Sequence, residues 1–132
     1  MTPLFKETIT LLNRRMAEDS PDGLDAWKKT TLERCVWVKT TVRGVSGTDV
    51  SLGQTVTVRI PESVDYRPYG TWKSDMKGFS ASVDDIVIHG RVAEEVTPDN
   101  VLDVAAKHES MTVRVVRDNT GLPLGHVRLE GL

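Results

Sequence analysis

The segment at residues 51–63, SLGQTVTVRIPES, constrains the fold more than any other part of the chain. Val56, Val58 and Ile60 alternate with the polar residues Thr57 and Arg59. A period of two predicts a β-strand with one apolar face and one polar face. The strand is expected to end at residue 61, because a proline there has no amide hydrogen for the ladder.

Other segments have the same strand character, with β-branched residues between turn signals. The Asn-Thr-Gly turn after Asp118 predicts a C-terminal hairpin, and Gly90 predicts a tight feature between two short strands. The expected strands lie within residues 4–15, 27–41, 80–96 and 110–132. Residues 16–26 and 42–53 collect Gly, Ser, Asp and Pro, so we expect an exposed loop and a loop or loose hairpin.

One helix is expected at about residues 97–108, TPDNVLDVAAKH. Thr97 suits the N-cap, Pro98 the first helical position, and Lys107 and His108 the negative end of the helix dipole. The 132 residues suit one domain, residues 1–132. We therefore predict a mainly β domain: a small antiparallel β-barrel or sandwich with one short helix and long loops.

Composition excludes several classes of partner and chemistry. The net charge of -2 gives no general drive toward nucleic acid or anionic lipid. A single cysteine, Cys35, leaves no internal disulfide and no cysteine metal cluster, and its flanks predict a buried side chain. No apolar run approaches the ~20 residues of a membrane span, and the N-terminus lacks the features of a signal peptide. A cytoplasmic protein without a membrane partner is expected.

The stretch around residues 84–89 is the strongest candidate for a metal or catalytic site. Asp85 and His89 fall on one face of the expected strand, but four residues along a strand separate them by about 13 Å, too far for one metal ion. His89, His108 and His126 form no chelating pattern. We interpret Asp84 and Asp85 as a turn, Ile86 and Ile88 as core, and His89 as a polar strand-end position.

No other motif predicts an enzyme. The serines do not lie in a Gly-x-Ser-x-Gly elbow, and residues 43–53 lack the Gly-Lys-Ser/Thr ending of a phosphate loop. We therefore predict no catalytic residue, no metal and no cofactor. Single-stranded nucleic-acid binding stays open as an alternative, because the long irregular segment at residues 64–79 combines aromatic and basic side chains.

The order of the segments resembles a known family over nearly the whole chain. The matching stretches are FKETITLLNR, DAWKKTTLERCVWV, VSLGQTVTVRIPES, VTPDN and MTVRVVRDNTGLPLGHVRLEG. DDIVIHGRV carries the best match, to a Gly-Asp-x-Ile-Val-x-x-Gly pattern in which Asp84 replaces the usual glycine. The chain resembles the small head-closure, or stopper, proteins, also called minor capsid proteins, of the head–tail connector in long-tailed phages and prophages.

The resemblance implies a structural virion protein rather than an enzyme. Such proteins form a ring, here of six or twelve subunits, between the portal–adaptor and the tail-completion protein, and help retain packaged double-stranded DNA. The expected location is the virion neck, assembled in the bacterial cytoplasm. Another tail-completion or minor virion protein is the alternative. Two segments are candidate partner-facing or channel-facing loops, through Arg43, Val45, Thr48, Asp49, Tyr66, Arg67, Tyr69, Trp72 and Lys73.

Overall fold

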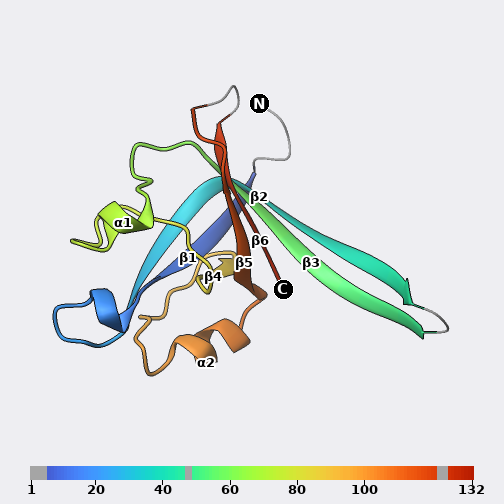
Figure 1. Ribbon diagram of the computed structural model, residues 1–132, viewed down its shortest axis with the longest axis horizontal. Helices are drawn as coiled ribbons and strands as arrows, with labels where there is room; N and C mark the ends of the chain where they lie inside the picture. The colour runs from blue at the N-terminus through green and yellow to red at the C-terminus, as the bar shows by residue number, and fades with distance from the viewer. Residues whose placement is uncertain (1–5, 47–48, 122–124) are drawn as a thin grey trace.

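The computed structural model describes residues 6–46, 49–121 and 125–132, with backbone only for residues 42–46 and 49–53. Antiparallel strands in the order β1-β2-β3-β6-β5-β4 close into a barrel, as β4 pairs with β1 (Figure 1). The prediction of a mainly β fold is confirmed, and the fold is a barrel. Its strands are β1 (Glu7–Arg15), β2 (Ala26–Ser46), β3 (Asp49–Pro61), β4 (Ile86–His89), β5 (Ser110–Asp118) and β6 (His126–Gly131).

A β-bulge in β2 lies next to the point where the strand changes its pairing partner from β1 to β3. Glu7 of β1 lies opposite Cys35, but Ile9 lies opposite Leu32, so β2 carries one extra residue between these pairs. Within the bulge Arg34 has a φ of 59°, a left-handed conformation typical of such sites. β2 pairs with β1 up to Cys35 and with β3 beyond it. The strand bends between these two stretches, as its cyan ribbon shows in Figure 1.

The alternation in β3 is confirmed by burial. Val56, Val58 and Ile60 are at most 4% exposed and point into the barrel core. The strand ends at Pro61, as its missing amide hydrogen predicts. Apolar side chains from all six strands, together with Phe79 from a loop, fill the interior. The core therefore excludes an open channel through the described barrel, in agreement with the small strand number.

A second apolar cluster lies outside the barrel under helix α2 (Val101–Ala106). In β4, Val87 points into the barrel, whereas Ile86 and Ile88 point outward. The outward pair packs with Val101 and Val104 of the helix. The prediction that Ile86 and Ile88 are core residues is thus confirmed, although their core is the helix–barrel layer.

Several element boundaries differ from the sequence prediction. The helix begins after Asn100 rather than Thr97, because Asn100 Oδ1 accepts a hydrogen bond from the Thr97 amide and holds residues 98–100 as a turn. Residues 16–26 and 64–79, expected to be loops, contain a short 3-10 helix (Ala17–Asp19) and helix α1 (Tyr69–Trp72).

The second strand expected after Gly90 does not form. Lys29 Nζ donates to the carbonyls of Val92 and Glu94, at 3.1 and 2.7 Å. Thr10 Oγ1 accepts from the Val92 amide at 3.2 Å. Side chains thus satisfy backbone groups that a strand ladder would otherwise pair.

Candidate assembly surfaces

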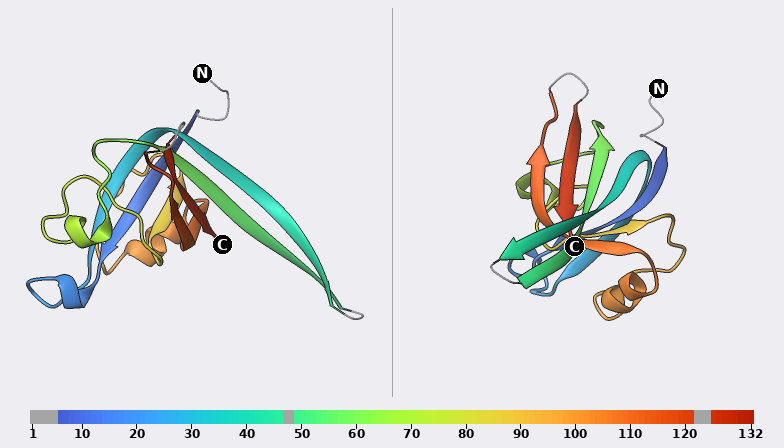
Figure 2. Two further views of the ribbon diagram at one scale, coloured as in Figure 1. Left: turned by 45° about the horizontal axis from the view of Figure 1, so that its top comes forward. Right: turned by 90° about the vertical axis from the view of Figure 1, so that its right-hand side faces the viewer.

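The hairpin of β2 and β3 extends well beyond the barrel. We call its projecting part the arm: residues 39–46 and 49–55, paired in register from Thr40 opposite Thr55 to Ser46 opposite Asp49. β3 pairs with β6 only from Val56 onward, and β2 pairs with β1 only up to Cys35. In the described residues, the outer backbone edges of the arm therefore have no strand partner. Figure 1 and the left view of Figure 2 show the arm projecting from the barrel.

An isolated two-stranded ribbon is marginally stable in water, and its open edges can pair with another chain. Lys39, Thr40, Thr41 and Gln54 are exposed, so the described part of the arm lacks a core of its own. These properties make the arm a candidate contact between molecules, by strand addition or by docking.

The arm contains the first group of candidate residues. Arg43 and Val45 lie in β2, and Asp49 begins β3. Thr48 lies outside the described residues. The expected loop or loose hairpin is thus a regular antiparallel hairpin, and these positions stay candidate contact residues.

The second candidate group lies in the segment between β3 and β4, where its aromatic rings pack inward. Trp72 is fully buried, and its Nε1 donates to the Gly78 carbonyl at 3.3 Å. The Tyr66 ring packs against Phe79 with centroids 5.7 Å apart, and Phe79 belongs to the barrel core. Tyr69 donates its hydroxyl proton to Asp19 at 2.7 Å.

The basic side chains of this segment are also engaged. Arg67 forms an ion pair with Asp75 and donates to the Lys77 carbonyl at 3.0 Å. Lys73 Nζ lies 3.1 Å from the Asp19 carboxylate. Single-strand binding by stacking requires exposed ring faces beside free positive charge. In the structure the rings pack inward and the basic side chains are ion-paired. The segment is therefore less suited to binding a single strand than its sequence indicates.

The buried carboxylate of Asp85 has a structural environment. It accepts hydrogen bonds from the Arg14 amide (2.9 Å), the Asn13 amide group (2.8 Å) and the Ser82 amide (2.8 Å). Burial raises the pKa of this carboxyl from 3.8 to about 6, against the opposing effect of these donors. Asp85 therefore ties β1 to the turn before β4.

Asp84 stands where the pattern that the sequence resembles has a glycine. Its φ of 79° lies in the left-handed region that favours glycine. Aspartate tolerates this conformation better than most residues, and its carboxylate lies 3.1 Å from Arg114. The turn thus keeps the backbone shape that a glycine would provide.

His89 and Cys35 are two further candidates for chemistry, and both lie in packed surroundings. The His89 ring stacks on Trp37 with centroids 4.8 Å apart, and Glu7 and Glu109 flank its two nitrogens at 3.3 and 3.1 Å. The two ring nitrogens face opposite sides, so each carboxylate lies near a different nitrogen. The two carboxylates and one nitrogen therefore do not surround a common metal position. Burial raises the pKa of the Cys35 thiol to about 12, so it is not a thiolate at neutral pH.

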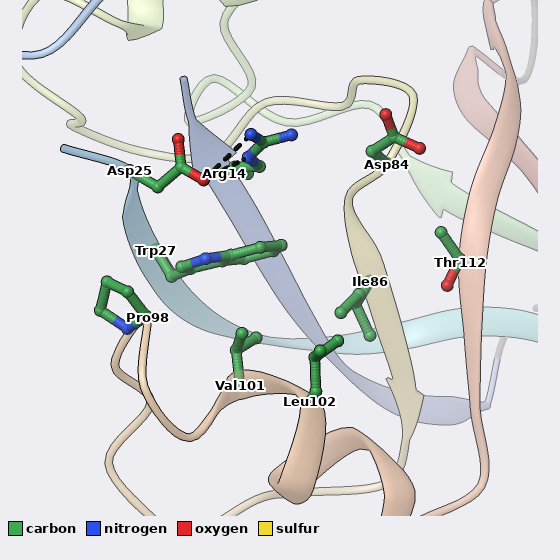
Figure 3. Close-up of a pocket in the computed structure, with 9 residues that line it drawn as sticks. All are labelled: Arg14, Asp25, Trp27, Asp84, Ile86, Pro98, Val101, Leu102 and Thr112. Atoms are coloured by element: carbon green, nitrogen blue, oxygen red, sulfur yellow. Dashed lines mark hydrogen bonds and ion pairs between the residues drawn. The ribbon is translucent and has the colours of Figure 1, made fainter. Parts of the chain in front are cut away.

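A groove that sequence reasoning missed runs between α2, the start of β2 and the loop before it. It comprises two adjoining concavities of about 360 and 690 Å³ that share Asp25, Trp27 and Pro98. Figure 3 shows the first, with the Trp27 ring between the Arg14–Asp25 ion pair and the side chains of the helix. The apolar lining includes Leu24, Trp27, Ile86, Val101 and Leu102.

The groove is acidic. Its carboxylates are Asp22, Asp25, Asp84 and Asp99, and Arg14 is the one basic residue among the described lining residues. Arg14 is neutralised by Asp25 at 2.9 Å. Residues that line the groove come from four separate segments, so no local motif in the sequence marks it.

The fold and these surfaces define a small closed antiparallel β-barrel with a packed loop, an acidic groove and a projecting two-stranded arm. In the described residues, no group of three or more His, Cys, Asp or Glu side chains is arranged to hold a metal ion. None of the described helices is long and apolar enough to span a bilayer.

Comparison with known proteins assigns the chain to a family. It belongs to the family of unknown function DUF6751, whose model matches residues 4–132. No curated protein and no solved structure matches the chain.

Proposed function

We propose that this protein is a structural subunit of a phage neck. It forms a head-closure ring between the portal–adaptor and the tail, joins head to tail, and helps retain packaged double-stranded DNA. It assembles in the bacterial cytoplasm and acts in the virion. Its role is mechanical, with no catalytic step and no cofactor.

The observation that carries this proposal is the arm. A ring subunit needs two different surfaces, because head-to-tail contacts join unlike patches on neighbouring copies. The arm supplies one such surface through its unpartnered backbone edges. The resemblance of the segment order to head-closure proteins supplies the context for that contact. A net charge of -2 suits a subunit that lines a DNA channel without gripping it.

Light scattering coupled to size-exclusion chromatography tests the proposal. The full chain is measured at rising concentration, alone and with the portal, adaptor and tail-completion proteins of the same phage or prophage. We expect a complex with at least one of these proteins, and rings of that complex in negative-stain images.

The alternative functions give different results. A strict monomer that ignores all neighbours and retards labelled single-stranded DNA would overturn the neck proposal in favour of a nucleic-acid-binding module. Binding only to tail proteins, with no portal or adaptor contact, would favour another tail-completion or minor virion protein.

A further inference from the structure

The acidic groove needs an occupant with both apolar and basic side chains. Trp27 lies along its floor with Val101, and Leu24 and Leu102 are 65% and 74% exposed beside it (Figure 3). Exposed apolar side chains beside several carboxylates are more typical of a surface that contacts a partner than of one that stays in water. The matching partner is therefore a segment rich in small apolar residues with a positive charge.

The arm has this composition. Its sequence contains several valines and threonines, and Lys39 and Arg43 outnumber the single carboxylate of Asp49. Lys39 is exposed, as are the threonines that follow it. The groove shows the opposite balance. Asp25 and Asp84 are paired with Arg14 and Arg114, whereas Asp22 and Asp99 form no ion pair with a described residue. We propose that the arm of one copy docks in the acidic groove of a second copy.

The contact has to form between molecules. Trp27 in the groove and Lys39 at the base of the arm lie toward opposite ends of β2. The strand path between them is up to about 40 Å long. In Figure 1 the arm points away from α2 and from the loop before β2, so an arm does not reach the groove of its own chain.

Such a contact is heterologous, since one copy contributes its arm and the next its groove. Repeated head to tail, it closes into a ring or continues as a filament. A ribbon of this length is about 25 Å long, so each contact buries less than the ~800 Å² per partner of a standard interface. The single contact is therefore weak, and closure of a ring would strengthen it through multivalency.

Two variants that each lack one half of the contact test this inference. In the first, Asn-Gly replaces residues 41–54 and joins Thr40 to Thr55, which already face each other. In the second, Asp99→Lys and Leu102→Lys reverse the charge and polarity of exposed groove positions. The matched control changes Asp103→Lys and Ala106→Lys, which are exposed on the same helix outside the groove.

Analytical ultracentrifugation then compares these proteins, with circular dichroism to confirm folding. We expect wild type and control to associate as concentration rises, and each of the two variants to stay monomeric. An equimolar mixture of the two variants should form a one-to-one heterodimer, because one keeps its groove and the other its arm.

Any of three results would overturn the inference. These are a mixture of the two variants that stays monomeric, an arm-deleted variant that still self-associates, and a wild type that is monomeric at every concentration. The inference deepens the proposed function but fails separately from it. A wild type that does not self-associate yet binds the portal–adaptor would refute the docking and leave the neck proposal standing.

Discussion

At the scale of single residues, Asp85 shows how a polar side chain supports the barrel. It is 1% exposed and accepts hydrogen bonds from Asn13, Arg14 and Ser82. Asn13 extends the network, as its side chain also donates to the Ser80 carbonyl at 2.7 Å and accepts from the Ser80 amide at 3.1 Å. The sequence interpretation of Asp85 as a turn carboxylate did not predict that its side chain is buried.

The burial of Asp85 predicts a pH dependence of stability. Its pKa is about 6 in the folded state, above the ordinary 3.8, so the folded chain binds more protons between these values. The free energy of unfolding therefore falls as pH rises from about 4 through 6, by on the order of 2–3 kcal/mol. Urea unfolding should show this fall in wild type relative to Asp85→Asn. A constant difference between the two proteins from pH 4 to 7 would contradict the prediction.

The left-handed backbone of Asp84 predicts a response to glycine. Asp84→Gly removes the Cβ that disfavours a φ of 79°, whereas the control Asp84→Ala keeps it; both remove the ion pair with Arg114. We expect the glycine variant to be about 1 kcal/mol more stable than the alanine variant. Urea unfolding measures the difference, and equal midpoints would count against strain at this turn.

At the scale of elements, the segment between β3 and β4 behaves as a packed part of the domain. A parallel bridge joins Tyr66 to Phe79, and the Arg67 amide donates to the Phe79 carbonyl at 2.8 Å. Gly78, with a φ of 71°, allows its backbone to approach Asp65 so closely that a Cβ would lie 2.1 Å from the Asp65 carbonyl oxygen. The segment is therefore a closed loop anchored at its two ends.

Trp72 provides the test of that packing. Trp72→Ala leaves a large cavity and should lower the free energy of unfolding by about 3–5 kcal/mol. Trp72→Phe, which keeps most of the ring volume but loses the hydrogen bond to Gly78, should cost clearly less. Thermal and urea unfolding measure both. If alanine cost no more than an exposed substitution, the loop would not be packed as described.

The arm should contribute little to the stability of the barrel. In the described residues its strands pair only with each other, so the Asn-Gly replacement of residues 41–54 removes no barrel hydrogen bond. We expect the free energy of unfolding to change by less than about 1 kcal/mol, since such a ribbon is marginally stable alone. A loss of several kcal/mol in urea unfolding would show that the arm belongs to the fold.

At the scale of the whole molecule, closure of the barrel and extension of the arm have opposite effects on the strand edges that are open to other chains. Closure pairs the strands with each other and limits the edges open to other chains. The arm exposes two such edges, and in Figure 1 it points away from α2. The result is a molecule with unlike surfaces, which is the geometry that the proposed head-to-tail assembly requires.

The charge difference between arm and groove predicts that self-association depends on salt. Raising the salt concentration from about 0.05 to 0.5 M shortens the screening length several-fold and should weaken association about tenfold. Sedimentation equilibrium measures this, with the Asp103→Lys, Ala106→Lys control expected to respond like wild type. Association that strengthens with salt would indicate an apolar contact instead.

Local pattern was sufficient for much of the fold. The alternation of Val56, Val58 and Ile60 gave the orientation of β3, and Pro61 gave its end, because both depend on the geometry of one strand. The helix was expected in the correct region but started too early, since the side chain of Asn100 holds the preceding turn. The projecting hairpin was expected to be a loop or a loose hairpin, because Gly, Ser and Asp are common in both; its regular pairing was not predicted.

The sequence by itself determined a mainly β fold, a buried cysteine and the inward face of β3. Only the tertiary structure decided that the sheet closes, because closure depends on β1 pairing with the distant β4. It also decided that Asp85 is buried, that Tyr66 and Trp72 pack inward, and that an acidic groove exists. These features arise where segments far apart in the chain meet, and a periodic pattern carries no information on which segments those are.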